Sequence, residues 1–186
     1  MKKRAIWLAA LVLLTGCGGK NRELERGLSL RARLLQGEGC SFSLDITADN
    51  GEQVCTFAMD CQADKQGGVT FTVTAPQTIA GIGGSLSGEG GKLTYGDTVL
   101  DLGTVAQGQV SPISAPWLLV KTLRSGCITA AGEDGELLRL SIDDSYADDS
   151  LQLDIWCDSA DTPVRAEVVW ENRRILSLTI RNFTIV

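Results

Sequence analysis

The sequence predicts an α+β fold that is mainly β, with a long antiparallel meander and two helices. From residue 40 onward, short segments alternate apolar and polar side chains, the pattern of strands with one buried face. Short connections separate consecutive strands, which favours antiparallel pairing because parallel strands need long crossovers. Two segments, near the start and in the middle of the chain, instead have helical spacing.

Residues 22–36 form the first predicted helix. The stretch RELERGLSLRARLLQ carries leucines at near-helical spacing with charged residues between them, and Gly27 weakens it. Such a helix could cover one face of a sheet. A helix on a membrane surface is the alternative, but the mixed charges give it no strongly basic face.

Residues 115–124 form the second predicted helix. The stretch SPISAPWLLVKTLRSG offers Ser114 as N-cap, Pro116 in the first turn and Gly126 as terminator, around an apolar run. Strands are predicted at 41–47, 53–59, 69–75, 77–88, 92–96 and 98–103 before this helix, and at 127–131, 136–142, 151–157, 164–170 and 175–186 after it.

The N-terminus predicts export across a membrane. Three basic residues precede an apolar run too short to span a bilayer as a stable helix, which is typical of a signal peptide. The run ends in Leu-Thr-Gly-Cys, which resembles the lipobox of bacterial lipoproteins. The resemblance implies cleavage before Cys17 and attachment of acyl chains there. The alternative is an ordinary secreted protein with a chance cysteine.

These features divide the chain into three parts. Residues 1–16 are the predicted lipoprotein signal peptide, residues 17–22 a lipidated tether, and residues 23–186 a single domain. The predicted location is extracytoplasmic, lipid-anchored to the bacterial cell membrane.

Composition argues against several functions. The net charge is −6, and removal of the signal peptide makes it more negative, because three basic residues are lost. Nucleic-acid binding is therefore not expected. The chain has no histidine, which removes the commonest metal ligand and general base. We therefore predict no catalytic residues, no metal site and no cofactor, and a protein that is not an enzyme.

Two motifs resemble functional sites but do not change this prediction. The glycine-rich segment 81–93 is not a phosphate loop, because Gly-Lys is not followed by Ser or Thr and no helix follows. The segment 143–149, DDSYADD, has four aspartates but lacks the spacing and terminal Glu of an EF-hand. It is interpreted as a solvated loop, and an enzymatic role for its aspartates is the least favoured hypothesis.

Asn50-Gly51 is predicted to be the two-residue turn of a β-hairpin, the strongest short hairpin signal. Pairing outward from this turn separates an apolar from a polar face, which a one-residue slip would scramble. Cys55 is expected to be a core residue next to Ile46. The apolar face comprises Phe42, Leu44, Ile46, Cys55, Phe57 and Met59.

Cys40 and Cys61 are predicted to form a disulfide. In this register they lie opposite each other on a non-hydrogen-bonded rung, where side chains approach closely, and an oxidising compartment permits the bond. Buried free thiols in a core face are the alternative. No CxxC motif or zinc spacing is present. Whether two of Cys55, Cys127 and Cys157 pair stays open.

The closing segment LQLDIWCDSADTPVRAEVVWENRRILSLTIRNFTIV resembles the LolA/LolB-like superfamily of lipoprotein-localisation factors. A strand with aromatic Trp156 leads to a turn with Pro163, then a strand 164–170 ending at a short reverse turn, then a strand closing on Asn182-Phe183. The stretch GKLTYGDTVLDL is similar to the family's central hairpin. The resemblance covers most of residues 22–186.

The resemblance implies an incomplete β-barrel, a strongly curved antiparallel sheet covered on its concave side by an N-terminal helix and a short central helix. In transport members that side is apolar and holds acyl chains. The implied function is a membrane-anchored lipoprotein that binds or carries lipid or acyl chains in an apolar concavity, with Trp117 and Leu118 joining the hairpin's apolar face.

The family also supplies an alternative function. This is a non-enzymatic envelope or spore-germination binding module that acts through a protein partner such as a cell-wall amidase. An open apolar cavity would favour the carrier, and a concave side filled by side chains would favour the binding module.

Overall fold

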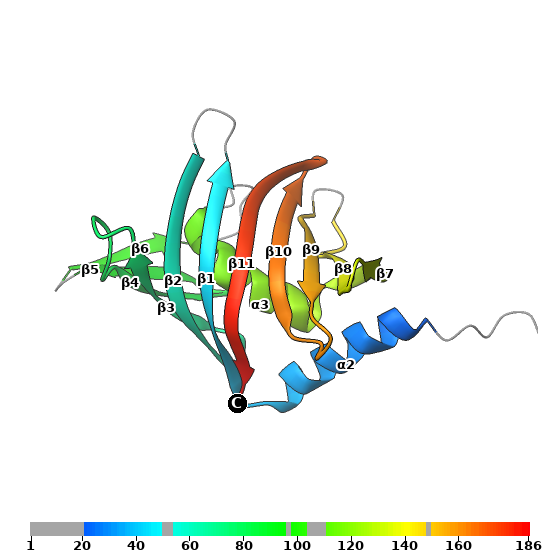
Figure 1. The fold of residues 1–186 in the computed structure, drawn as a ribbon. Coiled ribbons are helices and arrows are strands. Elements are labelled where there is room, and N and C mark those ends of the chain that lie inside the picture. The colour runs from blue at the N-terminus through cyan, green and yellow to red at the C-terminus, as the bar shows by residue number, and fades with distance from the viewer. Residues whose placement is uncertain (1–20, 50–53, 96–97, 104–110, 148–149) are drawn as a thin grey trace, which may run out of the picture.

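The computed structural model describes residues 21–49, 54–95, 98–103, 111–147 and 150–186 (Figure 1). Its strands form one 11-stranded sheet in the order β6-β5-β4-β3-β2-β1-β11-β10-β9-β8-β7. They are β1 (Gly39–Asp49), β2 (Val54–Asp64), β3 (Val69–Ala75), β4 (Gly83–Ser87), β5 (Gly90–Tyr95), β6 (Thr98–Gly103), β7 (Cys127–Asp134), β8 (Leu137–Asp143), β9 (Gln152–Cys157), β10 (Pro163–Trp170) and β11 (Arg173–Ile185).

Two antiparallel meanders make up this sheet. Strands β1 to β6 follow one another outward on one side, and β7 to β11 follow one another inward on the other. The meanders join at the centre, where β1 pairs antiparallel with β11 and Leu44 faces Ile180. Figure 1 shows the sheet curving around α3 without closing. The predicted class, a mainly β fold with an open, curved antiparallel sheet, is confirmed.

Helix α2 (Arg22–Gln36) is the predicted N-terminal helix. The Asn21 side chain caps its start by accepting a hydrogen bond from the Leu24 backbone N–H at 3.1 Å. The helix packs along β7 and β8. Gly27 permits this packing, because a Cβ there would lie 2.8 Å from Cδ2 of Leu140. The glycine that weakens the sequence pattern therefore allows close approach to the sheet.

Helix α3 (Ala115–Ser125) follows a short 3₁₀ turn, η1 (Pro112–Ser114), and crosses behind the strands in Figure 1. Ser114 occupies the N-cap position as predicted, but its hydroxyl donates to the Ser111 carbonyl at 2.6 Å and does not cap a helical N–H. Gly126 ends the helix, as predicted. In the described part of the chain, no helix combines the length and apolarity needed to cross a membrane.

The predicted strand at 77–88 is partly wrong. Residues 77–81 form turns, and only Gly83–Ser87 pair as β4. Gly81 has a φ of +89°, a conformation that side-chain-bearing residues rarely adopt, and its N–H donates to the Val73 carbonyl at 2.9 Å. The turn therefore folds back onto β3 before the strand begins.

Candidate functional site

The concave face of the sheet is apolar, because alternate residues of β1 and β2 point to the same side. Phe42, Leu44 and Ile46 of β1 are 3%, 0% and 0% exposed, and Met59 of β2 is 0% exposed. Phe57 is half-buried and packs against the same cluster. Five of the six hairpin residues expected on the apolar face thus lie together, and the sixth, Cys55, is exposed.

Helix α3 occupies the concave side. Its Leu118, Leu119 and Leu123 are 3%, 0% and 2% exposed and belong to the same hydrophobic cluster as the hairpin. The helix contacts β2 and β3 on one side and β8 on the other. Where the described residues define the concavity, it is packed by the protein's own side chains.

Trp117 lies at the edge of this packing. It is half-buried, and the ammonium of Lys121 lies 5.3 Å from its ring centroid. Lys121 also pairs with Asp144 at 3.0 Å, which ties α3 to the β8–β9 connection. Other half-buried apolar residues that pack against the core on this part of the chain are Phe57, Ile79, Ile82, Leu93 and Ile113.

The hairpin register differs by two residues from the prediction. Cys40 faces Ala63, and Cys61 faces Phe42. The predicted turn, Asn50-Gly51, lies outside the described residues, but Asp49 faces Val54, so four residues and not two separate the strands. A shift of two residues leaves each side chain on the same face of the sheet but changes its cross-strand partner.

Cys40 and Cys61 are therefore not opposite each other, and the predicted register is wrong. The two residues are now diagonal neighbours on one face, a relation that usually separates Cα atoms by about 7–8 Å, beyond normal disulfide geometry. Both are free thiols in the structure. The disulfide itself stays a prediction that only a chemical measurement can test.

Three of the five cysteines that the structure describes, Cys40, Cys61 and Cys157, are buried. Burial raises the pKa of Cys40 to about 11 and that of Cys157 to about 12, and it also raises the pKa of Cys61. A protonated thiol is a poor nucleophile and metal ligand. Cys55 was expected in the core beside Ile46, but it is exposed and faces Ala48, while Phe57 faces Ile46.

A bulge in β11 explains the Asn182-Phe183 motif. The pairing of β1 with β11 shifts between Ser41 and Ser43, and Asn182 takes a left-handed φ of 54°. Asparagine tolerates this conformation better than most residues. The extra residue allows Phe183 to stack on Phe42, with ring centroids 5.6 Å apart.

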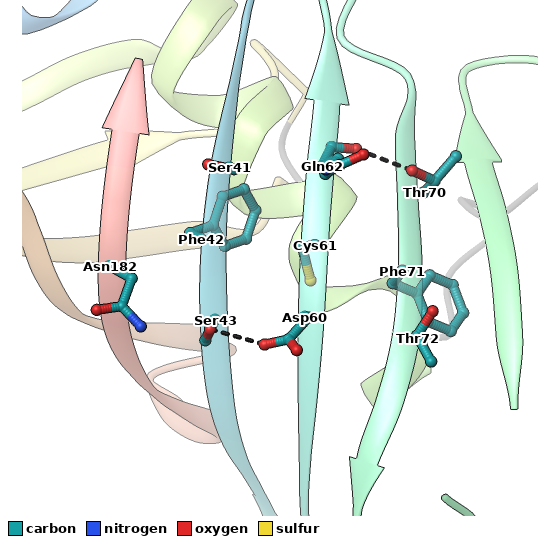
Figure 2. Close-up of a pocket in the computed structure, with 10 residues that line it drawn as sticks. All are labelled: Ser41, Phe42, Ser43, Asp60, Cys61, Gln62, Thr70, Phe71, Thr72 and Asn182. Atoms are coloured by element: carbon teal, nitrogen blue, oxygen red, sulfur yellow. Dashed lines mark hydrogen bonds between the residues drawn. The ribbon is translucent and has the colours of Figure 1, made fainter. Parts of the chain in front are cut away.

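A polar groove of about 510 Å³ lies across β1, β2 and β3 (Figure 2). Figure 2 shows α3 behind these strands, and exposed polar side chains such as Asp60, Gln62 and Thr72 alternate with buried ones. The polar side chains of the groove therefore lie on the face away from the helix. The Ser43 hydroxyl donates to Asp60 at 2.7 Å, and the Thr70 hydroxyl donates to the Gln62 carbonyl at 3.4 Å. The lining residues are Ser41, Phe42, Ser43, Asp60, Cys61, Gln62, Thr70, Phe71, Thr72 and Asn182.

The same outer face carries a buried tryptophan on β9. Trp156 pairs with Arg139 of β8 on one side and Arg165 of β10 on the other. The two guanidinium carbons lie 5.3 Å and 4.2 Å from its ring centroid, and its indole N–H donates to Asp134 at 2.8 Å. The indole is therefore covered by charged side chains and is only 4% exposed.

Asp154 lies beside this tryptophan and is also buried. Burial acts to raise its pKa, but hydrogen bonds from Ser141, Arg139 and Gln152 outweigh burial and hold the pKa below its usual range. Ser141 donates at 2.6 Å and Arg139 at 2.7 Å. The carboxylate is fully committed to fixing β8 against β9, which describes a structural rather than a catalytic group.

The acidic segment 143–149 also has a structural use where it is described. Asp144 accepts the Leu151 backbone N–H at 2.8 Å and the Lys121 ammonium at 3.0 Å. Asp148 and Asp149 lie outside the described residues. Among the residues that the structure describes, no group of three or more histidine, cysteine or acidic side chains is placed to hold a metal ion.

No protein-family model matches the sequence, and no curated protein matches it. Several solved structures, however, are similar to this chain. A LolA superfamily protein from Nitrosomonas europaea has a TM-score of 0.50 at 8% identity, over 86% of this chain and 93% of its own. A conserved protein from Thermus thermophilus has a TM-score of 0.48 at 10% identity, over 88% and 87%.

A third match comes from the structure of the CwlD amidase from Clostridioides difficile in complex with the GerS lipoprotein. Its TM-score is 0.47 at 9% identity, over 91% of this chain and 98% of that one. At such identities a likeness concerns the fold alone. The molecule is an open antiparallel half-barrel with helices on its concave side. Its fold is LolA/LolB-like.

Proposed function

We propose that the protein is a lipid-anchored lipoprotein of the bacterial cell envelope, with its domain outside the cytoplasm. The support is the N-terminal sequence, in which basic residues, an apolar run and Leu-Thr-Gly-Cys occur in that order. Residues 1–16 would be removed, and Cys17 would carry the acyl chains. Residues 1–20 lie outside the described part of the chain.

The anchor can be tested on the protein produced in a bacterial host. Mass spectrometry of the N-terminal peptide should show acyl chains on Cys17, with residues 1–16 absent. In Cys17→Ala the acyl mass should disappear and the precursor should accumulate. An unmodified Cys17 in the mature protein would rule out lipid anchoring.

The domain, in this proposal, is a non-enzymatic binding module. The observation that carries this is the position of α3, whose Leu118, Leu119 and Leu123 fill the concave side at 0–3% exposure. An acyl chain would need that space. The histidine-free composition and the raised thiol pKa values of the buried cysteines also speak against catalysis.

The outer face is the surface that we propose for a protein partner. Its groove combines hydroxyl, amide and carboxylate groups held at fixed distances by the sheet, such as Ser43 and Asp60. Interfaces of this kind gain specificity from polar groups that are already ordered.

Cross-linking in intact cells tests this surface. The wild-type protein should capture a stoichiometric envelope protein, and Thr72→Arg in the groove should lose it. Thr129→Arg on edge strand β7, also exposed, is the matched control and should retain the partner. Equal capture by both variants would exclude the groove, and capture of lipid alone would exclude the binding module.

Acyl-chain carrying is the second candidate, because several apolar side chains near the start of α3 are only half-buried. Trp117 and Ile113 are two of them. Protein purified without detergent would be extracted with organic solvent and examined by mass spectrometry. Stoichiometric acyl lipid that is lost in Trp117→Ala would favour the carrier. A lipid-free wild-type protein would exclude it.

A further inference from the structure

Helix α2 presents apolar side chains to solvent as well as to the sheet. Leu30 and Leu34 are buried against the domain, but Leu28 and Leu35 are 48% and 49% exposed. Leu28 and Leu35 are seven residues apart, with exposed Ala32 between them, and so lie on one stripe of the helix surface. Exposed leucines scattered singly are ordinary, whereas two on one stripe form a surface.

The anchor proposed above limits how far this helix can lie from the membrane. Five residue steps separate Cys17 from Arg22, the first residue of α2. A chain of that length spans at most about 18 Å even when fully extended. Acyl chains on Cys17 would therefore hold the first turn of α2 close to the membrane surface.

We propose that the outer stripe of α2, formed by Leu28, Ala32 and Leu35, packs on the membrane to which Cys17 is anchored. The inference rests on the proposed lipid anchor and adds the orientation of the domain. The occupant is the lipid surface itself, into which the two leucine side chains insert at the level of the headgroups.

The charges on α2 are compatible with this contact once the anchor is present. The exposed Arg22 has a long side chain that can reach a phosphate group while its stem lies along apolar surface. Glu23 and Glu25 in the first turn prevent a strongly basic face. The helix would not bind a membrane strongly by itself, but a short tether makes the contact intramolecular, so little intrinsic affinity is needed.

This orientation has a consequence for the rest of the molecule. In Figure 1 the ends of β1 and β2 that flank their connection lie far from α2, at the opposite end of the strands from the C-terminus. Val54, at the start of β2, is 65% exposed at that far end. It should therefore face away from the membrane.

Hydroxyl-radical footprinting of the lipidated protein tests the contact. The full chain, with a protease site inserted after Gly19, is reconstituted in vesicles of phosphatidylethanolamine and phosphatidylglycerol. Oxidation of Leu28 and Leu35 should be severalfold lower in the anchored protein than after protease release. Val54 is the internal control and should be oxidised equally in both samples.

A second measurement uses amide exchange of residues 22–36. In the wild type, exchange in α2 should be slower on vesicles than after release, and Leu28→Glu/Leu35→Glu should remove that difference. Ser29→Glu, an exposed change beside the stripe, should keep it. Both leucines are half-exposed, so the double variant should fold, which its exchange pattern in the strands would confirm.

Two results would overturn the inference in different ways. If the N-terminal peptide carries acyl chains but Leu28 and Leu35 are oxidised equally before and after release, the helix does not lie on the membrane and the anchor stands. If Cys17 carries no acyl chain, the proposed anchor fails and the inference fails with it.

Discussion

Arg124 of α3 donates from Nη1 to the carbonyl oxygen of Leu34 in α2 at 2.9 Å. The relation is reciprocal, because Arg31 of α2 donates from Nε to the carbonyl oxygen of Leu123 in α3, also at 2.9 Å. Each helix thus satisfies a C-terminal carbonyl of the other. Arg124 Nη2 also donates to the Lys65 carbonyl at 2.6 Å, which connects both helices to the β2–β3 turn.

Arg124→Lys should lower the free energy of unfolding by about 1–2 kcal/mol. A single ammonium cannot replace a planar guanidinium that reaches two carbonyls on different elements. Urea denaturation measures the loss. Arg181→Lys is the control, since Arg181 makes an exposed pair with Asp45, and should cost less than about 1 kcal/mol. Equal losses would show that the two carbonyl contacts contribute nothing specific.

Gly126→Ala should destabilise the protein by about 1–3 kcal/mol, because the added methyl has no space. A Cβ there would lie 2.6 Å from Cγ2 of Ile142, 2.7 Å from the Asp143 carbonyl and 2.8 Å from the Thr122 carbonyl. Two of these contacts are backbone and cannot swing away.

Gly132→Ala is the matched control for this change. Nothing lies within 4 Å of a Cβ at Gly132, so its stability should stay within about 0.5 kcal/mol of the wild type. Thermal denaturation measures both variants. Equal melting temperatures for Gly126→Ala and Gly132→Ala would contradict the packing at the end of α3.

Cys55 should react with a thiol reagent before Cys40, Cys61 and Cys157 do. It is exposed, whereas the other three are buried, and the raised pKa values of those three slow the formation of their thiolates. Alkylation of the native protein followed by peptide mapping gives the order of reaction. A peptide linking Cys40 to Cys61 under non-reducing conditions would support the predicted disulfide and contradict the diagonal register.

Acid should remove a stabilising contribution of Asp154. Its pKa is lowered in the folded protein, so the contribution is present above the unfolded pKa, near 4, and is lost as pH falls through the folded value. Asp154→Asn should cost about 1–3 kcal/mol at neutral pH and much less in acid. Urea denaturation from pH 7 to pH 3 should show the stabilities of the wild type and Asp154→Asn converging.

Asp45→Asn, a half-exposed control, should change stability by less than about 1 kcal/mol. A loss for Asp154→Asn that is the same at every pH would refute the role of its charge.

Local sequence patterns predicted the elements well. Alternation of apolar and polar residues predicted β3 at Val69–Ala75, glycine-rich turns predicted the bounds of β6 at Thr98–Gly103, and helical spacing predicted α2 at Arg22–Gln36. These patterns succeed because the period of side-chain direction is a property of the strand or helix itself. The apolar face of Phe42, Leu44, Ile46, Phe57 and Met59 follows from the same period.

Contacts between elements were harder to predict from the sequence. The register that placed Cys40 opposite Cys61 was wrong because a shift of two residues preserves both faces, so the hydrophobic pattern cannot distinguish the two registers. The sequence identifies Trp156 only as an aromatic residue of a strand. Its burial between Arg139 and Arg165 needs the register of three strands at once.

The sequence by itself determined the element types, the antiparallel meander, the apolar face of the first hairpin and the expectation of export. Each depends on residues close together in the chain. Only the tertiary structure decided that α3 fills the concave side, that Cys55 faces solvent, and that α2 keeps Leu28 and Leu35 exposed. The physical reason is that an apolar pattern requires a cover but does not specify which segment, ligand or membrane provides it.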